Sequence, residues 1–428
     1  MKTRTLLSRV GTLTRSHLAI AGLALGLGAL ASCHDDNENL PAIIPVPNSI
    51  VIADVNGEGA PDLLVATTAD EGASQNPGYA DVILNTPGSL GTFHTGVHYS
   101  TTGSNPSSIA VADLTSSGAL DMVIANFGSA SVSVFMHGAT AGTFNTAVDV
   151  PTGGQPNQVV SCDPHAKVAC DLTGNGKPSL VLADMSPDGN AIVLKADPAN
   201  PGKFLAAMNL PTGVTTPSVA VADLNGDGAP DIVAATFDSN GNNGAVYVFY
   251  QDPHNRGTFA APVVYPAGAQ PQSVKIADVD GDGLPDLIVA NLGPGTDGKG
   301  SAGVSVLLQD PAHPGSFLAP VTYSTPGASI DVAVADLNGD GKPDLAVANL
   351  APATTGSVSV LLQDPAHPGQ FLAATSYAGL GQPLSVAIAD LNGDGHPDIA
   401  LADGPSAGVL LQNAASPGTF APIMQVGF

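Results

Sequence analysis

The feature that most constrains this chain is an acidic loop that recurs seven times. In its clearest copy, residues 222–233, an oxygen-bearing side chain stands at loop positions 1, 3, 5 and 9 and Gly228 at position 6. Related stretches begin at Asp54, Asp113, Asp171, Asp278, Asp336 and Asp390, so successive copies start 52 to 59 residues apart. A period of this kind indicates a repeat architecture, in which each unit packs on its neighbours. We therefore treat nearly everything after residue 46 as one domain of seven units.

Within one repeat, short apolar runs alternate with turns. In the fifth copy these runs cover residues 271–279, 286–292, 303–309 and 316–323, and Gly, Pro, Asn or Asp flank each of them. Four short strands per unit, repeated seven times, are typical of a β-propeller. The sequence thus predicts an all-β fold. We expect a seven-bladed β-propeller of four-stranded blades over residues 48–428, with the acidic loop joining strands 1 and 2.

Two further patterns support this register. A Gly-x-Phe follows each third strand, and its aromatic ring is expected to pack between adjacent blades. These phenylalanines are Phe93, Phe144, Phe204, Phe259, Phe317, Phe371 and Phe420. The first strands otherwise carry small side chains, so Lys275 and Asp331 are exceptions in neighbouring repeats. We expect these two to form an ion pair that lines the central channel.

Oxygen ligands at alternate positions, followed by a glycine that permits a sharp turn, suit a hard cation such as Ca²⁺. An EF-hand would need a Glu at position 12, but the intact copies have Ala234, Val289, Val347 and Leu401 there, in expected strands. The EF-hand is therefore excluded, and a calcium loop between two strands is favoured.

The run SVAVADLNGDG-x-PDI-VA, with SVSVLLQ and GTF-AP after it, resembles the FG-GAP/VCBS repeat family. These are the calcium-loop propeller repeats of the N-terminal head of integrin α subunits. The resemblance covers about residues 47–428. It implies seven blades, calcium loops on the lower face and ligand engagement on the opposite face.

Carried over residue by residue, the resemblance implies about four structural Ca²⁺ sites, in repeats four to seven. Their ligands are Asp223, Asn225, Asp227 and Asp231; Asp278, Asp280, Asp282 and Asp286; Asp336, Asn338, Asp340 and Asp344; and Asp390, Asn392, Asp394 and Asp398. The first loop, with Asp54, Asn56, Glu58 and Asp62, is expected to bind more weakly. The second (Asp113, Thr115, Ser117, Asp121) and third (Asp171, Thr173, Asn175, Ser179) have few charges and are expected to be empty or weak.

The N-terminus indicates export. Residues 1–33 combine a basic start with an apolar run that ends in Leu-Ala-Ser-Cys, which resembles the lipobox of bacterial lipoproteins. Cys33 would then carry the lipid, and residues 34–47 would form a Pro-rich tether. The alternative is an ordinary secretory signal with a chance cysteine. We expect a lipid-anchored protein of the bacterial cell envelope, at the outer membrane or cell surface, with a disulfide between Cys162 and Cys170.

Charge limits the choice of partner. Without residues 1–33 the chain has 8 Lys and Arg against 37 Asp and Glu. Such a surface argues against nucleic acid and against anionic lipid, so contact with the membrane is expected through the lipid anchor only. We expect a monomer.

Function is expected on the face opposite the acidic loops, where the connections between strands 2 and 3 differ most in length. The candidate contacts are Asp70, Glu71, Tyr79, Asp238, Asn240, Asn242, Asp297 and Lys299. We expect a binding or adhesion module for a protein or a glycan, without catalytic residues. A carbohydrate-active propeller enzyme such as a polysaccharide lyase, a purely structural surface protein, and glycine-rich loops without a ligand stay open. The shortage of basic residues weighs against a lyase that acts on an acidic polysaccharide.

Overall fold

The computed structural model describes residues 46–68, 77–86, 91–161, 171–241, 244–294, 302–351, 355–404 and 406–426. These ranges belong to one compact unit, Ala42–Phe428, and contain 28 strands and a single short 3-10 helix, η1 (Phe127–Ser129). None of the helical structure in them is long or apolar enough to cross a membrane. The expected signal sequence, Cys33, most of the tether, and the cysteines at 162 and 170 lie outside the described residues.

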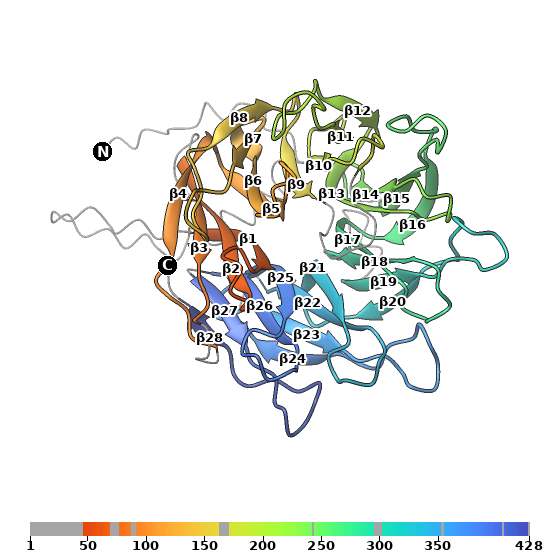
Figure 1. The fold of residues 1–428 in the computed structure, drawn as a ribbon. Helices are drawn as coiled ribbons and strands as arrows, with labels where there is room; N and C mark the ends of the chain where they lie inside the picture. The colour runs from red at the N-terminus through yellow and green to blue at the C-terminus, as the bar shows by residue number, and fades with distance from the viewer. Residues whose placement is uncertain are drawn as a thin grey trace, which may run out of the picture. The chain divides into compact units, whose positions relative to one another are not determined.

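The strands form seven four-stranded antiparallel sheets, each built from four strands that follow one another along the chain. This confirms the predicted seven-bladed propeller (Figure 1). Blades 1 to 3 consist of β1 (Val46–Ala53), β2 (Asp62–Thr68), β3 (Pro77–Ile83), β4 (Val97–Ser104); β5 (Pro106–Ala112), β6 (Asp121–Asn126), β7 (Ser131–Phe135), β8 (Val148–Pro151); β9 (Pro156–Val160), β10 (Leu180–Asp184), β11 (Asn190–Leu194) and β12 (Met208–Pro211).

Blades 4 to 7 repeat the same order. They consist of β13 (Thr215–Ala222), β14 (Asp231–Phe237), β15 (Gly244–Phe249), β16 (Val263–Gly268); β17 (Pro271–Ala277), β18 (Asp286–Asn291), β19 (Gly303–Leu307), β20 (Val321–Ser324); β21 (Ala328–Ala335), β22 (Asp344–Leu350), β23 (Ser357–Leu361), β24 (Thr375–Ala378); β25 (Pro383–Ala389), β26 (Asp398–Asp403), β27 (Ser406–Leu410) and β28 (Met424–Val426).

Burial follows the position of the strand within its blade. The second strands, such as Asp286–Asn291, are buried along their full length, because both of their faces are covered by neighbouring blades. The fourth strands form the outer rim and are mostly exposed. The first strands surround the axis (Figure 1), where their Val and Ala side chains are small enough to converge.

The apolar core is divided into seven clusters, and each cluster joins two neighbouring blades. Phe144, Phe317, Phe371 and Phe420 are buried in four of these clusters, as predicted for the Gly-x-Phe position. Each ring meets a tyrosine of the preceding blade edge-on, with centroids 5.4–5.6 Å apart, in an arrangement that favours aromatic pairs.

A belt of polar side chains near the axis joins all seven blades. Each first strand has a β-bulge next to the belt residue, which is Ser49, Ser108, Gln158, Ser218, Ser273, Asp331 or Ser385 in chain order. In six of the seven junctions the belt side chain accepts a hydrogen bond from a backbone N–H of the next blade. In the remaining junction Ser273 donates to Asp331 over 2.7 Å. The belt includes the junction between blades 7 and 1, where Ile50 N–H donates to Ser385.

The ring closes by this packing alone in the part of the chain that the structure describes. Strand β1 packs against β25 and β26, while blade 1 takes all four of its strands from the N-terminal end and blade 7 from the C-terminal end. No described strand of one terminus is shared with the sheet of the other.

Asp331 is the most heavily bonded member of the belt. Its carboxylate accepts hydrogen bonds from the Ser273 and Ser385 hydroxyls and from Val386 N–H, and it lies 3.3 Å from the Lys275 ammonium. The predicted Lys275–Asp331 ion pair is therefore confirmed. Because its partners come from blades 5 and 7, this one carboxylate of blade 6 links three blades.

We predict that Asp331→Ala lowers the free energy of unfolding by about 2–4 kcal/mol, because it leaves two hydroxyls, two N–H groups (of Val332 and Val386) and one ammonium without their acceptor. Chemical denaturation of the two proteins measures the change. Asp331→Asn, which keeps an acceptor oxygen, serves as the matched control and should lose less. An unchanged midpoint for Asp331→Ala would show that the belt contributes nothing.

Candidate metal centre

Each acidic loop lies between strands 1 and 2 of its blade, where the sequence placed it. In blade 5 the loop runs from Asp278, just after β17, to Asp286, the first residue of β18. Asp278 accepts hydrogen bonds from the N–H groups of Gly281 (2.7 Å) and Gly283 (2.9 Å). Both glycines have positive φ, +79° and +89°, which lets the chain wrap around the first carboxylate.

The side chains at positions 3 and 5 each cap the backbone two residues further on. Asp280 accepts from Asp282 N–H (3.1 Å), and Asp282 accepts from Leu284 N–H (2.8 Å). Aspartate and asparagine favour such local turns because their short side chains reach their own backbone. These turns fix the conformation of the loop.

The aspartate at position 9 belongs to the core rather than to the surface. Asp286 is 1% exposed, and its two oxygens accept from Val279 N–H (2.9 Å) and Gln309 N–H (2.8 Å). Its carboxylate therefore joins the loop, the second strand and the end of the third strand. Six blades repeat this arrangement, through Asp62, Asp121, Asp231, Asp286, Asp344 and Asp398.

In blade 5 the loop brings three carboxylates together. One oxygen each of Asp278, Asp280 and Asp286 lies within 4.8 Å of the other two, and this is the one such acidic group among the described residues. Blades 1, 4, 6 and 7 have an asparagine at position 3, so the amide oxygen of Asn225 or its equivalent takes the place of one carboxylate there.

The position-9 aspartates of five loops have raised pKa values, because burial and neighbouring negative charges disfavour their ionised form. Burial, assisted by the negative charges at positions 1 and 5, raises the pKa of Asp231 to about 7. Burial and the charges of Asp280 and Asp278 likewise raise the pKa of Asp286 to about 7. For Asp62, Asp344 and Asp398 the same causes raise the pKa to about 6. A cluster of oxygen-only donors with unfavourable mutual repulsion fits a hard divalent cation.

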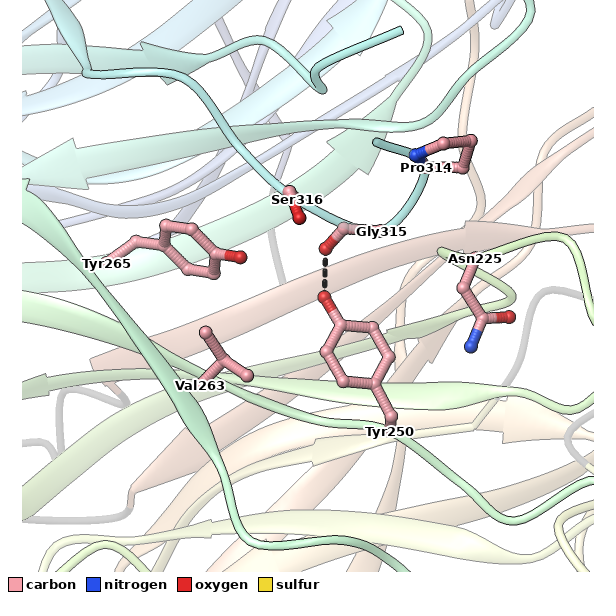
Figure 2. Close-up of a pocket in the computed structure, with 7 residues that line it drawn as sticks. All are labelled: Asn225, Tyr250, Val263, Tyr265, Pro314, Gly315 and Ser316. Carbon is pink, nitrogen blue, oxygen red and sulfur yellow. Dashed lines mark hydrogen bonds between the residues drawn. The ribbon is translucent and has the colours of Figure 1, made fainter. Parts of the chain in front are cut away.

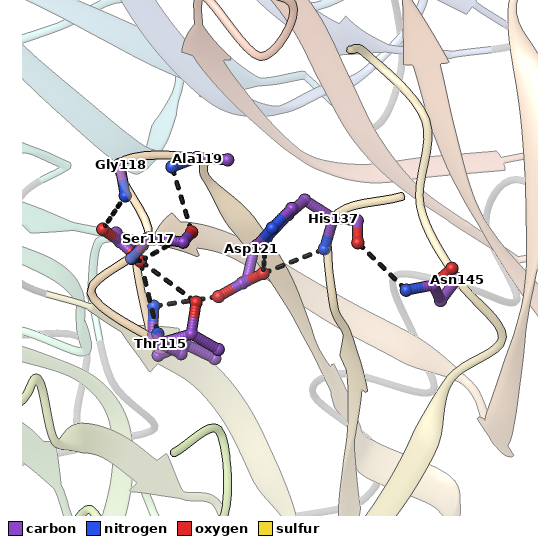
Figure 3. A network of polar contacts seen from close by, with 9 residues as sticks. Thr115, Ser117, Gly118, Ala119, Asp121, His137 and Asn145 are labelled. Carbon is purple, nitrogen blue, oxygen red and sulfur yellow. Dashed lines mark hydrogen bonds and ion pairs between the residues drawn. The ribbon is translucent and has the colours of Figure 1, made fainter. Parts of the chain in front are cut away.

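The second loop replaces charge with neutral hydrogen bonds (Figure 3). Ser117 accepts from Ala119 N–H (3.2 Å), and the hydroxyls of Thr115 and Ser117 each lie 3.4 Å from Asp113. Burial raises the pKa of Asp113, but four backbone N–H bonds outweigh it and hold the pKa below its ordinary value. His137 also contacts Asp121, over 2.8 Å. The polar groups of this loop bond with one another, and the expected weak or empty site stays a prediction.

The third loop has lost the buried carboxylate altogether. Ser179 stands at position 9, fully buried, and its hydroxyl has no hydrogen-bond partner. Two basic side chains bind at this junction instead. Arg256 of blade 4 donates to the Asp171 carbonyl (3.4 Å) and the Gly228 carbonyl, and the Lys195 ammonium donates to the Gly257 carbonyl (2.8 Å). Sequence reasoning missed this exchange, because Lys195 and Arg256 are 61 positions apart.

The loops also contact the next blade. Gly369, in the Gly-x-Phe turn of blade 6, lies against position 3 of the blade 5 loop, so that a Cβ on this glycine would come within 2.9 Å of Asp280 Cβ. Gln363 of blade 6 donates to the Val279 carbonyl (2.6 Å), and Asn85 of blade 1 donates to the Leu391 carbonyl (2.8 Å). A loop that is ordered by a cation would therefore support the junction as well as its own blade.

The candidate residues of the opposite face are only partly described. Asp70, Glu71, Asn242, Asp297 and Lys299 lie outside the described residues. Asp238 caps a tight turn by accepting from Asn240 N–H (2.9 Å), and Asn240 is exposed. Tyr79 belongs to β3, where its ring lies 5.8 Å from the ring of His98 on β4.

Next to Tyr79 lies a polar cluster that the sequence did not reveal. Asp81 is fully buried; it accepts from the Thr67 hydroxyl (2.5 Å) and contacts His98 Nδ1. Burial raises the pKa of Asp81, although Thr67 and His98 lower it in part. The His98 side chain is 49% exposed. No spacing rule could have found this group, because its members come from three adjacent strands.

These features define the class of the molecule: a seven-bladed β-propeller with an acidic loop between the first two strands of each blade. Residues 171–234, 223–289 and 348–401 match the FG-GAP-like repeat, and residues 330–361 match the FG-GAP repeat. The chain is thus an FG-GAP repeat propeller, and the matched stretches lie in blades 3 to 7.

Solved structures resemble the chain in fold. A putative 6-phosphogluconolactonase from Bacteroides fragilis has a TM-score of 0.53 at 13% identity, over 91% of this chain and 98% of its own. A second putative 6-phosphogluconolactonase, from Bacteroides uniformis, has a TM-score of 0.51 at 14% identity, over 90% and 97%. Such low identities establish the propeller architecture alone. Among curated proteins, none is similar enough in sequence to count as a relative.

We predict that calcium raises the unfolding temperature and that a chelator lowers it, since a cation would relieve the repulsion within each cluster. Thermal melts measure the difference. Asp282→Asn should lose part of the calcium increment, whereas Ser117→Asn, the same position in the second loop, should leave it unchanged. Identical midpoints with calcium and with chelator would contradict a structural metal.

Acidity provides a separate test on metal-stripped protein. Between pH 3.8 and about 7 the five position-9 aspartates with raised pKa bind protons in the folded protein that they release on unfolding. The free energy of unfolding should therefore rise as the pH falls from 8 to 5. With calcium the slope should reverse, because the metal needs deprotonated ligands. Denaturation at several pH values measures both slopes; a fall in stability towards pH 5 without metal would contradict the assignment.

Proposed function

We propose that this FG-GAP propeller is a calcium-stabilised binding module that presents a recognition surface for a protein or a glycan on the bacterial cell envelope. The observation that carries the proposal is the buried aspartate at position 9, which recurs in six blades and in each joins the loop to the second strand and the end of the third. Oxygen donors that are part of the core in blade after blade support a ring; they do not form one reaction centre.

Five loops supply the donors for the cations. Those of blades 4 to 7 use positions 1, 3, 5 and 9, namely Asp223, Asn225, Asp227 and Asp231 in blade 4 and their equivalents in blades 5 to 7. The blade 1 loop, with Glu58, is the weaker fifth. Bound Ca²⁺ neutralises carboxylates that otherwise repel one another. At tenfold excess over its Kd each independent site adds about 1.4 kcal/mol, so four sites add about 5–6 kcal/mol, as much as the stability of a small domain.

Recognition is assigned to the face away from the loops. The calcium-type loops repeat with little variation, whereas the connections between the second and third strands differ in length from blade to blade. Variable loops on a rigid scaffold are where binding residues are concentrated in proteins. Blade 1 lies across the axis from blades 4 and 5 (Figure 1), and the connections of blades 1 and 5 are the longest of the seven.

Attachment to the membrane is assigned to a lipid on Cys33, with residues 34–47 as spacer. The net charge of −25, spread over a surface rich in aspartate, disfavours nucleic acid and anionic lipid as partners. The propeller acts as a monomer that meets its partner at the cell surface.

A carbohydrate-active enzyme is the alternative, and one observation favours it. His98 is oriented through Nδ1 by the buried Asp81 and stands beside Tyr79, so its Nε2 is available to a ligand as a base or an acid. Turnover of a polysaccharide that is abolished by His98→Ala, with the unfolding temperature unchanged, would select this alternative.

The test of the binding proposal is a glycan array together with a bacterial-surface pull-down, using the purified full-length protein in calcium. We expect a reproducible partner whose capture falls when chelator is added, because the ring loses its support. Asp331→Asn, which changes the channel lining and leaves the recognition face intact, is the control and should retain capture. Release of cleaved polysaccharide would overturn the proposal. Capture that is unchanged when the connections between the second and third strands are shortened would also overturn it.

A further inference from the structure

The junction between blades 4 and 5 is the one with an aromatic residue directly after the third strand. The residue that follows the third strand contacts the Gly-x-Phe turn of the next blade. It is Tyr250 in blade 4, whereas the equivalents in the other blades are Leu84, Met136, Lys195, Leu308, Leu362 and Leu411. The tyrosine side chain is longer than that of leucine, and its hydroxyl donates to the Gly315 carbonyl of blade 5. Tyr250 thus forms a hydrogen bond that supports the turn of the next blade.

A cavity of about 260 Å³ lies beside Tyr250 (Figure 2). Blade 4 lines it with Asn225, Tyr250, Val263 and Tyr265, and blade 5 lines it with the turn Pro314–Gly315–Ser316. Tyr265 stands across from Tyr250 with its hydroxyl directed into the same space. The Tyr265 ring is held in place by Phe317, which it meets edge-on with centroids 5.4 Å apart. One wall of the cavity is therefore fixed by the core between the two blades.

The polar side chains that line the cavity are neutral. Asn225 accepts from Asp227 N–H over 3.0 Å through its oxygen. Its amide nitrogen lacks the bond to the position-5 carboxylate that Asn338 (3.3 Å) and Asn392 (3.1 Å) make within the described loops of blades 6 and 7. Burial raises the pKa of Tyr250 well above its ordinary value, so its hydroxyl keeps its proton. The cavity thus offers an amide donor and hydroxyl oxygens that can accept hydrogen bonds, beside aromatic surface.

This chemistry selects the class of ligand. A pyranose ring has apolar C–H faces that pack on aromatic rings and hydroxyls that bond with amide and hydroxyl groups. The volume lies just under the roughly 300–1,000 Å³ of drug-sized pockets, which suits one ring. None of the lining residues is charged, and Asp223 and Asp227 of the adjoining loop repel an anion.

We infer that the cavity between blades 4 and 5, lined by Tyr250, Tyr265 and Asn225, is a subsite for a single neutral sugar ring. The inference rests on the proposed binding function and makes it specific to a saccharide. It also places this contact at a junction between blades, beside an acidic loop, in addition to the recognition face proposed above.

The test uses purified full-length protein in calcium, titrated with methyl β-glucopyranoside, methyl α-mannopyranoside and N-acetylglucosamine by calorimetry and saturation-transfer NMR. We expect at least one of them to bind with a dissociation constant on the order of 1 mM, as befits a single ring. Tyr250→Leu introduces the residue found at four of the other junctions and should weaken binding at least tenfold. Tyr265→Phe should weaken it too, and Tyr323→Phe, the same change one junction further on, should not.

Three results would overturn the inference: none of the three sugars binds, Tyr250→Leu and Tyr265→Phe bind as the unaltered protein does, or tetramethylammonium binds in their place. The second result, combined with a positive glycan array, would leave the proposed function standing and remove only the subsite. A negative array and a negative pull-down would remove the function itself. If Tyr250→Leu fails to fold, Tyr265→Phe decides the outcome.

Discussion

The structure depends on a carboxylate that is buried at the start of the second strand. In six blades this aspartate accepts one backbone hydrogen bond from the loop and one from the end of the third strand, at 2.7–3.1 Å. A buried charge is costly unless it is hydrogen-bonded and balanced, so the group holds the loop, the second strand and the end of the third strand in one arrangement. The raised pKa values of five of these aspartates show that hydrogen bonds alone do not balance it, and calcium is the counter-charge that we propose.

The seven blades solve the problem of joining neighbours in different ways. Five loops keep oxygen-bearing side chains at positions 1, 3, 5 and 9. In the second loop Thr115 and Ser117 bond with Asp113, and in the third a serine replaces the buried carboxylate while Arg256 and Lys195 bind backbone carbonyls at its junction. Near the axis all junctions share the polar belt, which is independent of the loops. The ring therefore has an inner connection in every blade and a second connection whose chemistry varies.

Much of the fold followed from the sequence because the pattern is repeated seven times. Blade number, strand order, loop position and the burial of four of the phenylalanines were predictable, since each rests on equivalent positions in successive repeats. The Lys275–Asp331 pair was predictable because two opposite charges interrupt that pattern in neighbouring repeats. The double bonding of Asp286, the contact of Gly369 with Asp280, the Asp81–His98 cluster and the Tyr250 cavity were not. Each of these depends on which side chains face one another across strands or blades, and a repeat period does not contain that information. The metal itself stays a prediction.

The way the ring closes has a consequence for how such a chain can change. The junction between the last and first blades has the same polar belt and the same kind of apolar cluster as the other six, with no described strand exchanged across it. The junction between blades 7 and 1 is thus chemically equivalent to the other six, although the first and last strands of the ring meet there. A circular permutant that starts between any two blades would keep all of these contacts, so gene fusions and rearrangements can move the termini around the ring while the architecture persists.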